Sequence, residues 1–166
     1  MIEEAILDAI DQALSLLPRA MTSDRARVML ITIGLQESRF EHRRQIVGGK
    51  PIGPAKGFWQ FERGGGCKGV VTHLASRYWM HQICQQRGVA FNATAIWNAI
   101  EHDDVLAAAA ARLLLFTDPR SLPDVDDARG GWNLYFRTWR PGQPHRQTWD
   151  GFHQQSLLTL IERTES

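Results

Sequence analysis

Apolar residues recur at spacings of three and four along most of the chain, which is the pattern of amphipathic helices. The first such stretch ends before Pro18 and places five apolar side chains on one face: Ile2, Ile6, Ile10, Ala13 and Leu17. The same reasoning predicts helices over residues 24–37, 70–87, 92–100, 103–116, 129–139 and 149–161. The pattern therefore predicts a single, mainly α domain over residues 1–166, of the α+β class with one small β region.

The helix expected over residues 24–37 differs from the others because its middle is apolar on nearly every side. Ser23 supplies an N-cap, and residues 28–35 predict a helix that is buried inside the domain. Glu37 closes this helix, on the same stripe that carries Met29 and Ile33 into the core. A carboxylate in such a place needs a chemical explanation.

Partial burial favours the protonated form of a carboxyl group, and an acid that keeps its proton near neutral pH can donate it to a leaving-group oxygen. Proton donation of this kind is the central step in breaking a glycosidic bond. The alternative is a solvated glutamate at a helix end, as most glutamates are. Glu37 is therefore a candidate general acid.

A short strand is expected over residues 58–62, after a loop with several Gly and Pro breaks. Strand alternation places Phe58, Gln60 and Glu62 on one face, with Trp59 and Phe61 on the other. Gln60 and Glu62 then look into one groove. Glu62 is either a second catalytic carboxylate or the partner of a nearby arginine in an exposed ion pair.

Glu37-Ser38-x-Phe40 at the end of a buried helix, followed by Gly57-Phe58-Trp59-Gln60, resembles the lytic transglycosylase and goose-type lysozyme group. The segment 53–62 is most similar to a phage-encoded branch of these muramidases. The resemblance implies a lysozyme-like fold, in which a helical body faces a small β region across the active-site groove. It also implies that Glu37 is the acid and that the Gly-x-x-Gln segment lines the sugar cleft.

A third segment, Gly131-Trp132-Asn133, lies where the family usually shows Ala-Tyr-Asn, and Tyr135 follows it. The resemblance implies that Asn133 and Tyr135 bind substrate together with Ser38 and Gln60. The Tyr135 hydroxyl is expected to bond the sugar or to orient Glu37, and Ser38 is expected to fix the cleft beside the acid.

The resemblance implies one substrate, the β-1,4 bond between N-acetylmuramic acid and N-acetylglucosamine in bacterial peptidoglycan. A transglycosylase closes a 1,6-anhydro ring with a single acid, whereas a lysozyme uses water and would take Glu62 as base or nucleophile. The transglycosylase outcome is slightly favoured. The alternative from another class is a catalytically silent virion or wall-binding protein that keeps the fold.

Composition narrows the possible partners and surroundings. The net charge of +1 provides no broad field for nucleic acid, although a basic aromatic strip exists at Arg137, Trp139, Arg140, His145 and Arg146. The 16 arginines suit carboxylates, which muropeptides carry in number.

The longest apolar run, residues 105–116, is too short to cross a bilayer and predicts a core helix. The acidic start of the chain argues against a signal peptide and for action from the host cytoplasm or a virion. We expect a monomer that needs no cofactor. We also expect no metal, because His73, His81 and Cys84 lack the paired spacing of a zinc site.

Overall fold

The computed structural model describes residues 1–165 and is built mainly of α-helices, which confirms the helical part of the expected fold class. A 3-10 turn, η1 (Arg19–Met21), and a π-helical turn, η2 (Arg63–Cys67), accompany the helices. The helices are α1 (Glu4–Ser15), α2 (Asp24–Ser38), α3 (Lys68–Thr72), α4 (Arg77–Arg87), α5 (Ala93–Ala99), α6 (Asp104–Phe116), α7 (Ala128–Trp139) and α8 (Arg146–Glu165).

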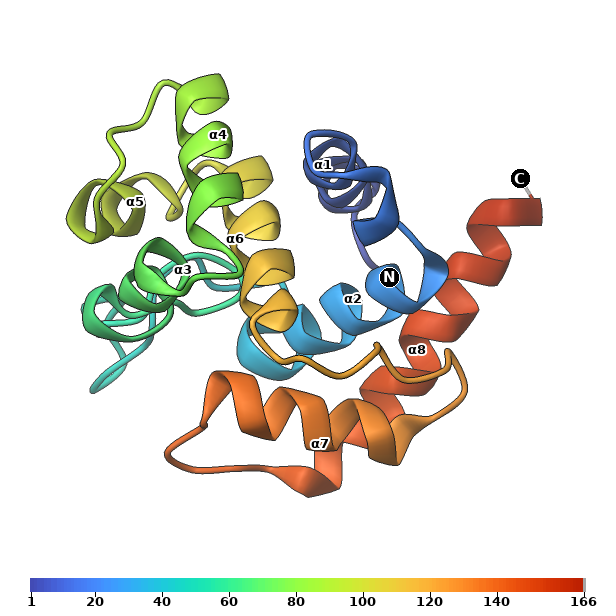
Figure 1. The fold of residues 1–166 in the computed structure, drawn as a ribbon. Helices are drawn as coiled ribbons and strands as arrows, with labels where there is room; N and C mark the ends of the chain where they lie inside the picture. The colour runs from blue at the N-terminus through green and yellow to red at the C-terminus, as the bar shows by residue number, and fades with distance from the viewer. Residues whose placement is uncertain (166) are drawn as a thin grey trace.

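Helix α2 runs through the middle of the molecule, with α1 and α6 on one side and α7 and α8 on the other (Figure 1). Its most extensive partner is α8, and α1 packs mainly on α6. Every residue of α2 from Val28 to Leu35 is buried, which explains why this helix is apolar all round. Inside the interface with α8, the Thr32 hydroxyl donates a hydrogen bond of 2.9 Å to the Ser156 hydroxyl.

Helix α6 is the other core helix. All of its residues from Val105 to Leu115 are buried, including Arg112, whose Nε donates to the backbone oxygen of Met21 at 2.9 Å. Burial lowers the pKa of the Arg112 guanidinium to about 10. The run 105–116 is thus a core helix, as expected, and in the described part of the chain no helix is both long and apolar enough to span a membrane.

The strand expected over residues 58–62 is wrong. Residues 57–60 form a tight turn, closed by two backbone hydrogen bonds of 3.0 and 2.9 Å between Lys56 and Phe61. The backbone is left-handed at Gly57 (φ 74°) and again at Gln60 (φ 52°), so the chain reverses instead of extending. Gly57 is required there, because a Cβ would lie 2.9 Å from the backbone oxygen of Ile100. Residues 1–165 contain isolated bridges but no extended strand.

The single helix expected over residues 70–87 is also wrong, since α3 and α4 are separate. The break lies between His73 and Ser76, where side chains replace the helical backbone partners. The Ser76 hydroxyl donates to the backbone oxygen of Val70 at 2.8 Å, and Nδ1 of His73 accepts from the Ala75 amide at 3.0 Å. Local side-chain bonds of this kind compete with helix continuation.

Two helical glycines provide a test of how tightly α2 is packed. A Cβ on Gly34 would overlap the ring of Phe40, whereas a Cβ on Gly151 in α8 would meet open space. We expect Gly34→Ala to destabilise the protein by about 1–3 kcal/mol through overpacking. Gly151→Ala is expected to stabilise it by about 0.5–1 kcal/mol through helix propensity. Urea unfolding of both variants measures the difference, and equal shifts would contradict the packing described here.

Candidate active site

An open groove of about 540 Å³ lies beside the C-terminal end of α2. The turn at residues 57–60 and the π-helical turn η2 form one wall, and the end of α7 with the loop that follows it forms the other. The lining includes two carboxyl groups, several amides and three aromatic rings, contributed by Gln36, Glu37, Gln45, Gln60, Phe61, Glu62, Tyr135, Trp139, Arg140, Gln143 and His145 among others. The groove therefore joins parts of the chain that are up to 109 positions apart.

Glu37 sits in the last turn of α2, where the buried helix meets the groove. Its Oε2 accepts a hydrogen bond of 2.7 Å from the Tyr135 hydroxyl. Burial raises the pKa of Glu37 from 4.5 to about 7, and the bond from Tyr135 acts against this shift. A substantial fraction of the Glu37 carboxyl groups therefore carry a proton at neutral pH.

Tyr135 is held rigidly by aromatic neighbours. It is 2% exposed and stacks on Trp149 with ring centroids 5.1 Å apart. Burial and the nearby Glu37 raise the pKa of Tyr135, so the phenol keeps its proton and stays a donor. One turn earlier in α7, a Cβ on Gly131 would lie 3.3 Å from both Met29 and Trp149, so a small residue suits this close packing.

Gln60 and Glu62 both line the groove, although the expected strand does not carry them there. The left-handed turn places Gln60, whose Nε2 donates to the backbone oxygen of Gly57 at 2.8 Å. Trp59 and Phe61 are buried as expected, but so is Phe58, which does not share the face of Gln60. Glu62 is exposed, and within residues 1–165 it forms no ion pair.

Ser38 is 4% exposed and does not line the groove, so it is not placed to touch a substrate. Its hydroxyl donates to the backbone oxygen of Phe58 at 2.7 Å and accepts from the Phe40 amide at 3.1 Å. Ser38 thus fixes the 57–60 turn against the end of α2.

Asn133 is exposed and is not among the residues that line the groove, so the structure does not bring it together with Glu37 and Gln60. The reason is helical geometry. Two residues along a helix correspond to about 200° of rotation, so Asn133 and Tyr135 face different sides of α7. The helix expected over residues 129–139 is present as α7, but Asn133 lies on a side of it that does not line the groove.

Several residues that shape the groove belong to none of the three motifs. Nε1 of Trp139 donates to the backbone oxygen of Trp59 at 2.9 Å and ties α7 to the turn. Nε2 of Gln36 donates to the backbone oxygen of His145 at 3.0 Å, which fixes the loop after α7 beside the acid. Gln36 directly precedes Glu37, and this adjacency is the one sequence feature that could have pointed to Gln36 as a groove residue.

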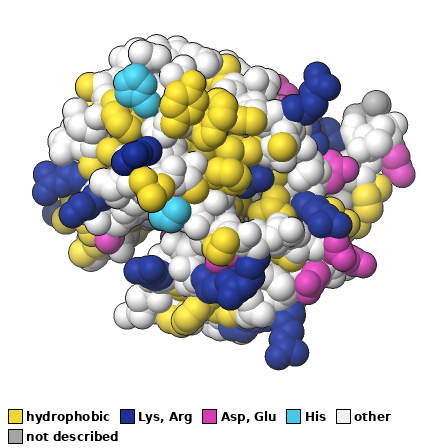
Figure 2. All heavy atoms as spheres, viewed as in Figure 1, with side chains coloured by type: hydrophobic (Ala, Val, Ile, Leu, Met, Phe, Trp, Pro, Cys, Tyr) yellow, Lys and Arg dark blue, Asp and Glu magenta, His cyan; other side chains and the backbone are white. Residues whose placement is uncertain are grey.

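The basic strip considered for nucleic acid is largely neutralised. Arg137 pairs with Asp118 at 2.9 Å, and Arg146 pairs with Asp150 at 2.8 Å. On the face shown in Figure 2, lysine and arginine side chains are scattered and do not merge into one stripe. Within residues 1–165, no group of three His, Cys, Asp or Glu side chains is placed to hold a metal ion.

Comparisons of the chain with protein-family models, with curated proteins and with solved structures found no match. The central feature of the groove is one partly buried carboxyl group, Glu37, with a tyrosine donor on one oxygen.

The turn at residues 57–60 provides the next prediction. Gln60→Ala should weaken the lysis of purified sacculi, the activity expected from the sequence, and leave the melting temperature nearly unchanged, because the side chain lines the groove and bonds only its own turn. Trp59→Ala should lower the free energy of unfolding by about 3–5 kcal/mol, because the ring is only 1% exposed. The substitution also removes the hydrogen bond of 2.8 Å that Nε1 of Trp59 donates to the backbone oxygen of Leu30. Thermal unfolding and turbidity assays separate the two effects, and equal stability losses would contradict these placements.

Proposed function

We propose that this chain is a peptidoglycan-cleaving muramidase of lysozyme-like fold, with Glu37 as general acid. The observation that carries the proposal is the Glu37 carboxyl, which lies in an open groove, has a pKa of about 7 and is held at Oε2 by Tyr135. General acids work best when their pKa is close to the pH of the reaction. The Glu-Ser-x-Phe and Gly-x-x-Gln motifs support the choice of substrate.

Protonated Glu37 donates to the oxygen that leaves C1 of N-acetylmuramic acid. Because Tyr135 donates to Oε2, the carboxyl proton resides on Oε1, the oxygen that Tyr135 leaves free. As the C1–oxygen bond breaks, the Glu37 carboxylate forms, and Tyr135 stabilises its negative charge. The surrounding groove provides amide groups, including Gln60, that can hydrogen-bond the sugar.

The second half of the reaction decides between the two classes of muramidase. In the transglycosylase route, the muramyl C6 hydroxyl attacks C1, its proton passes to Glu37, and a 1,6-anhydro ring closes without water. In the lysozyme route, Glu62 assists water or attacks C1. Glu62 is exposed, and within residues 1–165 its carboxylate accepts no hydrogen bond, which supports the anhydro product because a catalytic base needs a fixed position.

The similarity of segment 53–62 to phage muramidases supports a phage origin. We propose that the protein acts as a monomer on the bacterial wall, reaching it from the host cytoplasm or as part of a virion. The alternative is a catalytically silent protein of the same fold, which the Glu37→Gln variant distinguishes from an enzyme.

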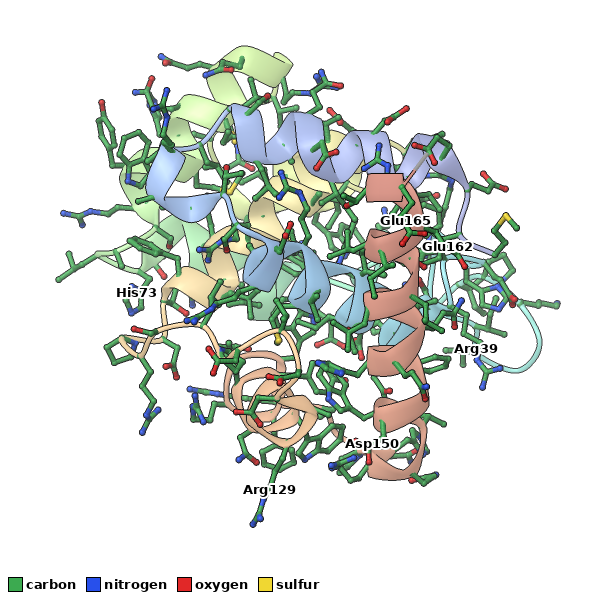
Figure 3. The ribbon with its side chains drawn as sticks, turned by 90° about the vertical axis from the view of Figure 1, so that its right-hand side faces the viewer. Arg39, His73, Arg129, Asp150, Glu162 and Glu165 are labelled. Atoms are coloured by element: carbon green, nitrogen blue, oxygen red, sulfur yellow. The ribbon has the colours of Figure 1, made fainter. Side chains whose placement is uncertain are left out.

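Glu37→Gln should keep the fold and lower the rate of lysis of purified sacculi by roughly 100- to 10,000-fold, the usual contribution of a general acid. The amide has the same shape and still accepts a bond from Tyr135. Glu162→Gln is a matched control, because Glu162 is exposed near the C-terminal end of α8 (Figure 3) and does not line the groove. A folded Glu37→Gln protein that lyses sacculi at the wild-type rate would show that the protein is a binding or structural component.

Digestion in heavy-oxygen water distinguishes the two routes. We expect 1,6-anhydromuramyl ends without the label, and substantial activity in Glu62→Gln. Mass spectrometry of the released muropeptides measures both the end groups and the label. Labelled reducing ends would make the protein a lysozyme, and a collapse of Glu62→Gln to the level of Glu37→Gln would make Glu62 its base or nucleophile.

The pH dependence of the rate tests the bond between Tyr135 and Glu37. A general acid is active while protonated, so kcat/KM should fall as the pH rises through about 7. The Tyr135 bond lowers the pKa of Glu37, so Tyr135→Phe should raise that pKa and move the fall to higher pH. Tyr78→Phe is the control, because Tyr78 is exposed on α4 and outside the groove. If kcat/KM of Tyr135→Phe falls at the same pH as that of the wild type, the Tyr135 hydrogen bond does not influence the pKa of Glu37.

A further inference from the structure

Arg140 lines the groove directly after the last residue of α7. It is exposed, and its guanidinium has no carboxylate, carbonyl or aromatic partner within residues 1–165. Four other arginines share this isolation, namely Arg19, Arg63, Arg77 and Arg129. Arg140 is the one of the five that lines the groove.

The backbone at Arg140 is unusual for a side chain of this size. Arg140 caps α7 with a left-handed conformation (φ 49°), and its amide donates to the backbone oxygen of Phe136 at 3.2 Å. Glycine or asparagine normally occupies this capping position, and another residue there costs on the order of 1 kcal/mol. Strained residues of this kind concentrate at binding sites, where the side chain is needed.

The backbone of Arg140 is restrained by both of its neighbours in the chain. The preceding residue, Trp139, is tied to the backbone of Trp59, and the following residue, Pro141, has a restricted φ. Arg140 lies five residues after Tyr135, which corresponds to about 7 Å along the axis of α7. The backbone thereby places a permanent cation in the same groove as Glu37, displaced along it from the acid.

The charges in the groove define what this cation can bind. Glu37 is bonded to Tyr135, and neither Glu37 nor Glu62 forms an ion pair with Arg140. A guanidinium binds a carboxylate with two parallel N–H donors, and this geometry favours arginine over lysine. The peptide stems of peptidoglycan carry carboxylates, whereas the sugar hydroxyls and acetamido groups are uncharged.

We propose that Arg140 is a specificity-determining residue, whose guanidinium binds a carboxylate of the peptide stem while the glycan lies across Glu37. This assignment rests on the proposed muramidase function. It makes the protein selective for glycan strands with acidic peptides and explains why the groove keeps an unpaired, strained arginine beside its uncharged amides.

Chemical amidation of the substrate provides the test. Purified sacculi are compared with sacculi whose carboxyl groups have been converted to amides with carbodiimide and ammonia. Wild-type protein should cut the amidated sacculi roughly 5- to 10-fold more slowly, mainly through KM, because one charge-assisted bidentate contact is lost. Arg140→Gln should show the same loss on native sacculi and no further loss on amidated ones, and Arg140→Lys should retain part of the activity.

Arg129→Gln is the matched control, since Arg129 is also exposed and unpaired but points away from α7 into solvent (Figure 3). It should respond to amidation as the wild type does. An equal response to amidation in wild type and Arg140→Gln would overturn the assignment, because the two changes would then act independently.

Binding separates this assignment from the proposed function. Co-sedimentation of Glu37→Gln with native and amidated sacculi is compared with that of the double variant Glu37→Gln/Arg140→Gln. Binding that depends on Arg140 and on substrate carboxylates supports the assignment even if the wild type cuts nothing, in which case only the muramidase proposal fails. Equal binding by the single and the double variant to native sacculi would overturn the role of Arg140.

Discussion

The complete burial of α2 is the constraint on which the rest of the structure depends. A helix that is apolar on all sides must be covered on all sides, and α6, α8 and their neighbours arrange themselves around it. The cover ends at the last turn, where Gln36 and Glu37 emerge half-buried at the groove. The environment that raises the pKa of Glu37 is therefore a direct consequence of how the core is built.

The chain must then leave a buried helix abruptly, and it does so with strained backbone. Arg39 and Phe40 both have φ of 55°, and Phe40 folds back into the space that Gly34 leaves open. Gln60 and Arg140 are the other residues besides glycine with a left-handed backbone in the part of the chain described by the structure, and both line the groove. Each costs on the order of 1 kcal/mol. The location of Gln60 and Arg140 in one groove indicates that the surrounding contacts impose these two turns.

The fold was predictable wherever local periodicity determines the structure. The helices at α1, α2, α6 and α7 follow from apolar spacing and from caps such as Ser23, which accepts from the Ala26 amide. The turn at residues 57–60 was not predictable, because its shape depends on distant groups. The Gly57 amide donates to Arg43, and the Phe58 oxygen accepts from Ser38. Alternating side chains in a five-residue segment carry no information about such bonds.

The residues of the candidate site likewise fall into those that the sequence identifies and those that only distant contacts position. Glu37 was identifiable from a carboxylate on a buried helix, and Tyr135 from its motif, but the bond between them joins residues 98 positions apart. Asn133 shares the motif with Tyr135 and still faces away. The loop after α7, which brings Arg140 and His145 to the groove, has no periodic signal at all.

Two opposed effects set the acidity of Glu37, and their balance matters for the proposed chemistry. Burial favours the neutral carboxyl, whereas the Tyr135 donor favours the carboxylate, and the outcome is a pKa of about 7. Burial alone would yield a group that holds its proton more tightly, and an exposed glutamate would lose it well below neutral pH. In the single-acid route the same carboxyl must first give a proton and then take one back. A value close to the working pH keeps both transfers accessible, so the buried helix and the stacked tyrosine are required together.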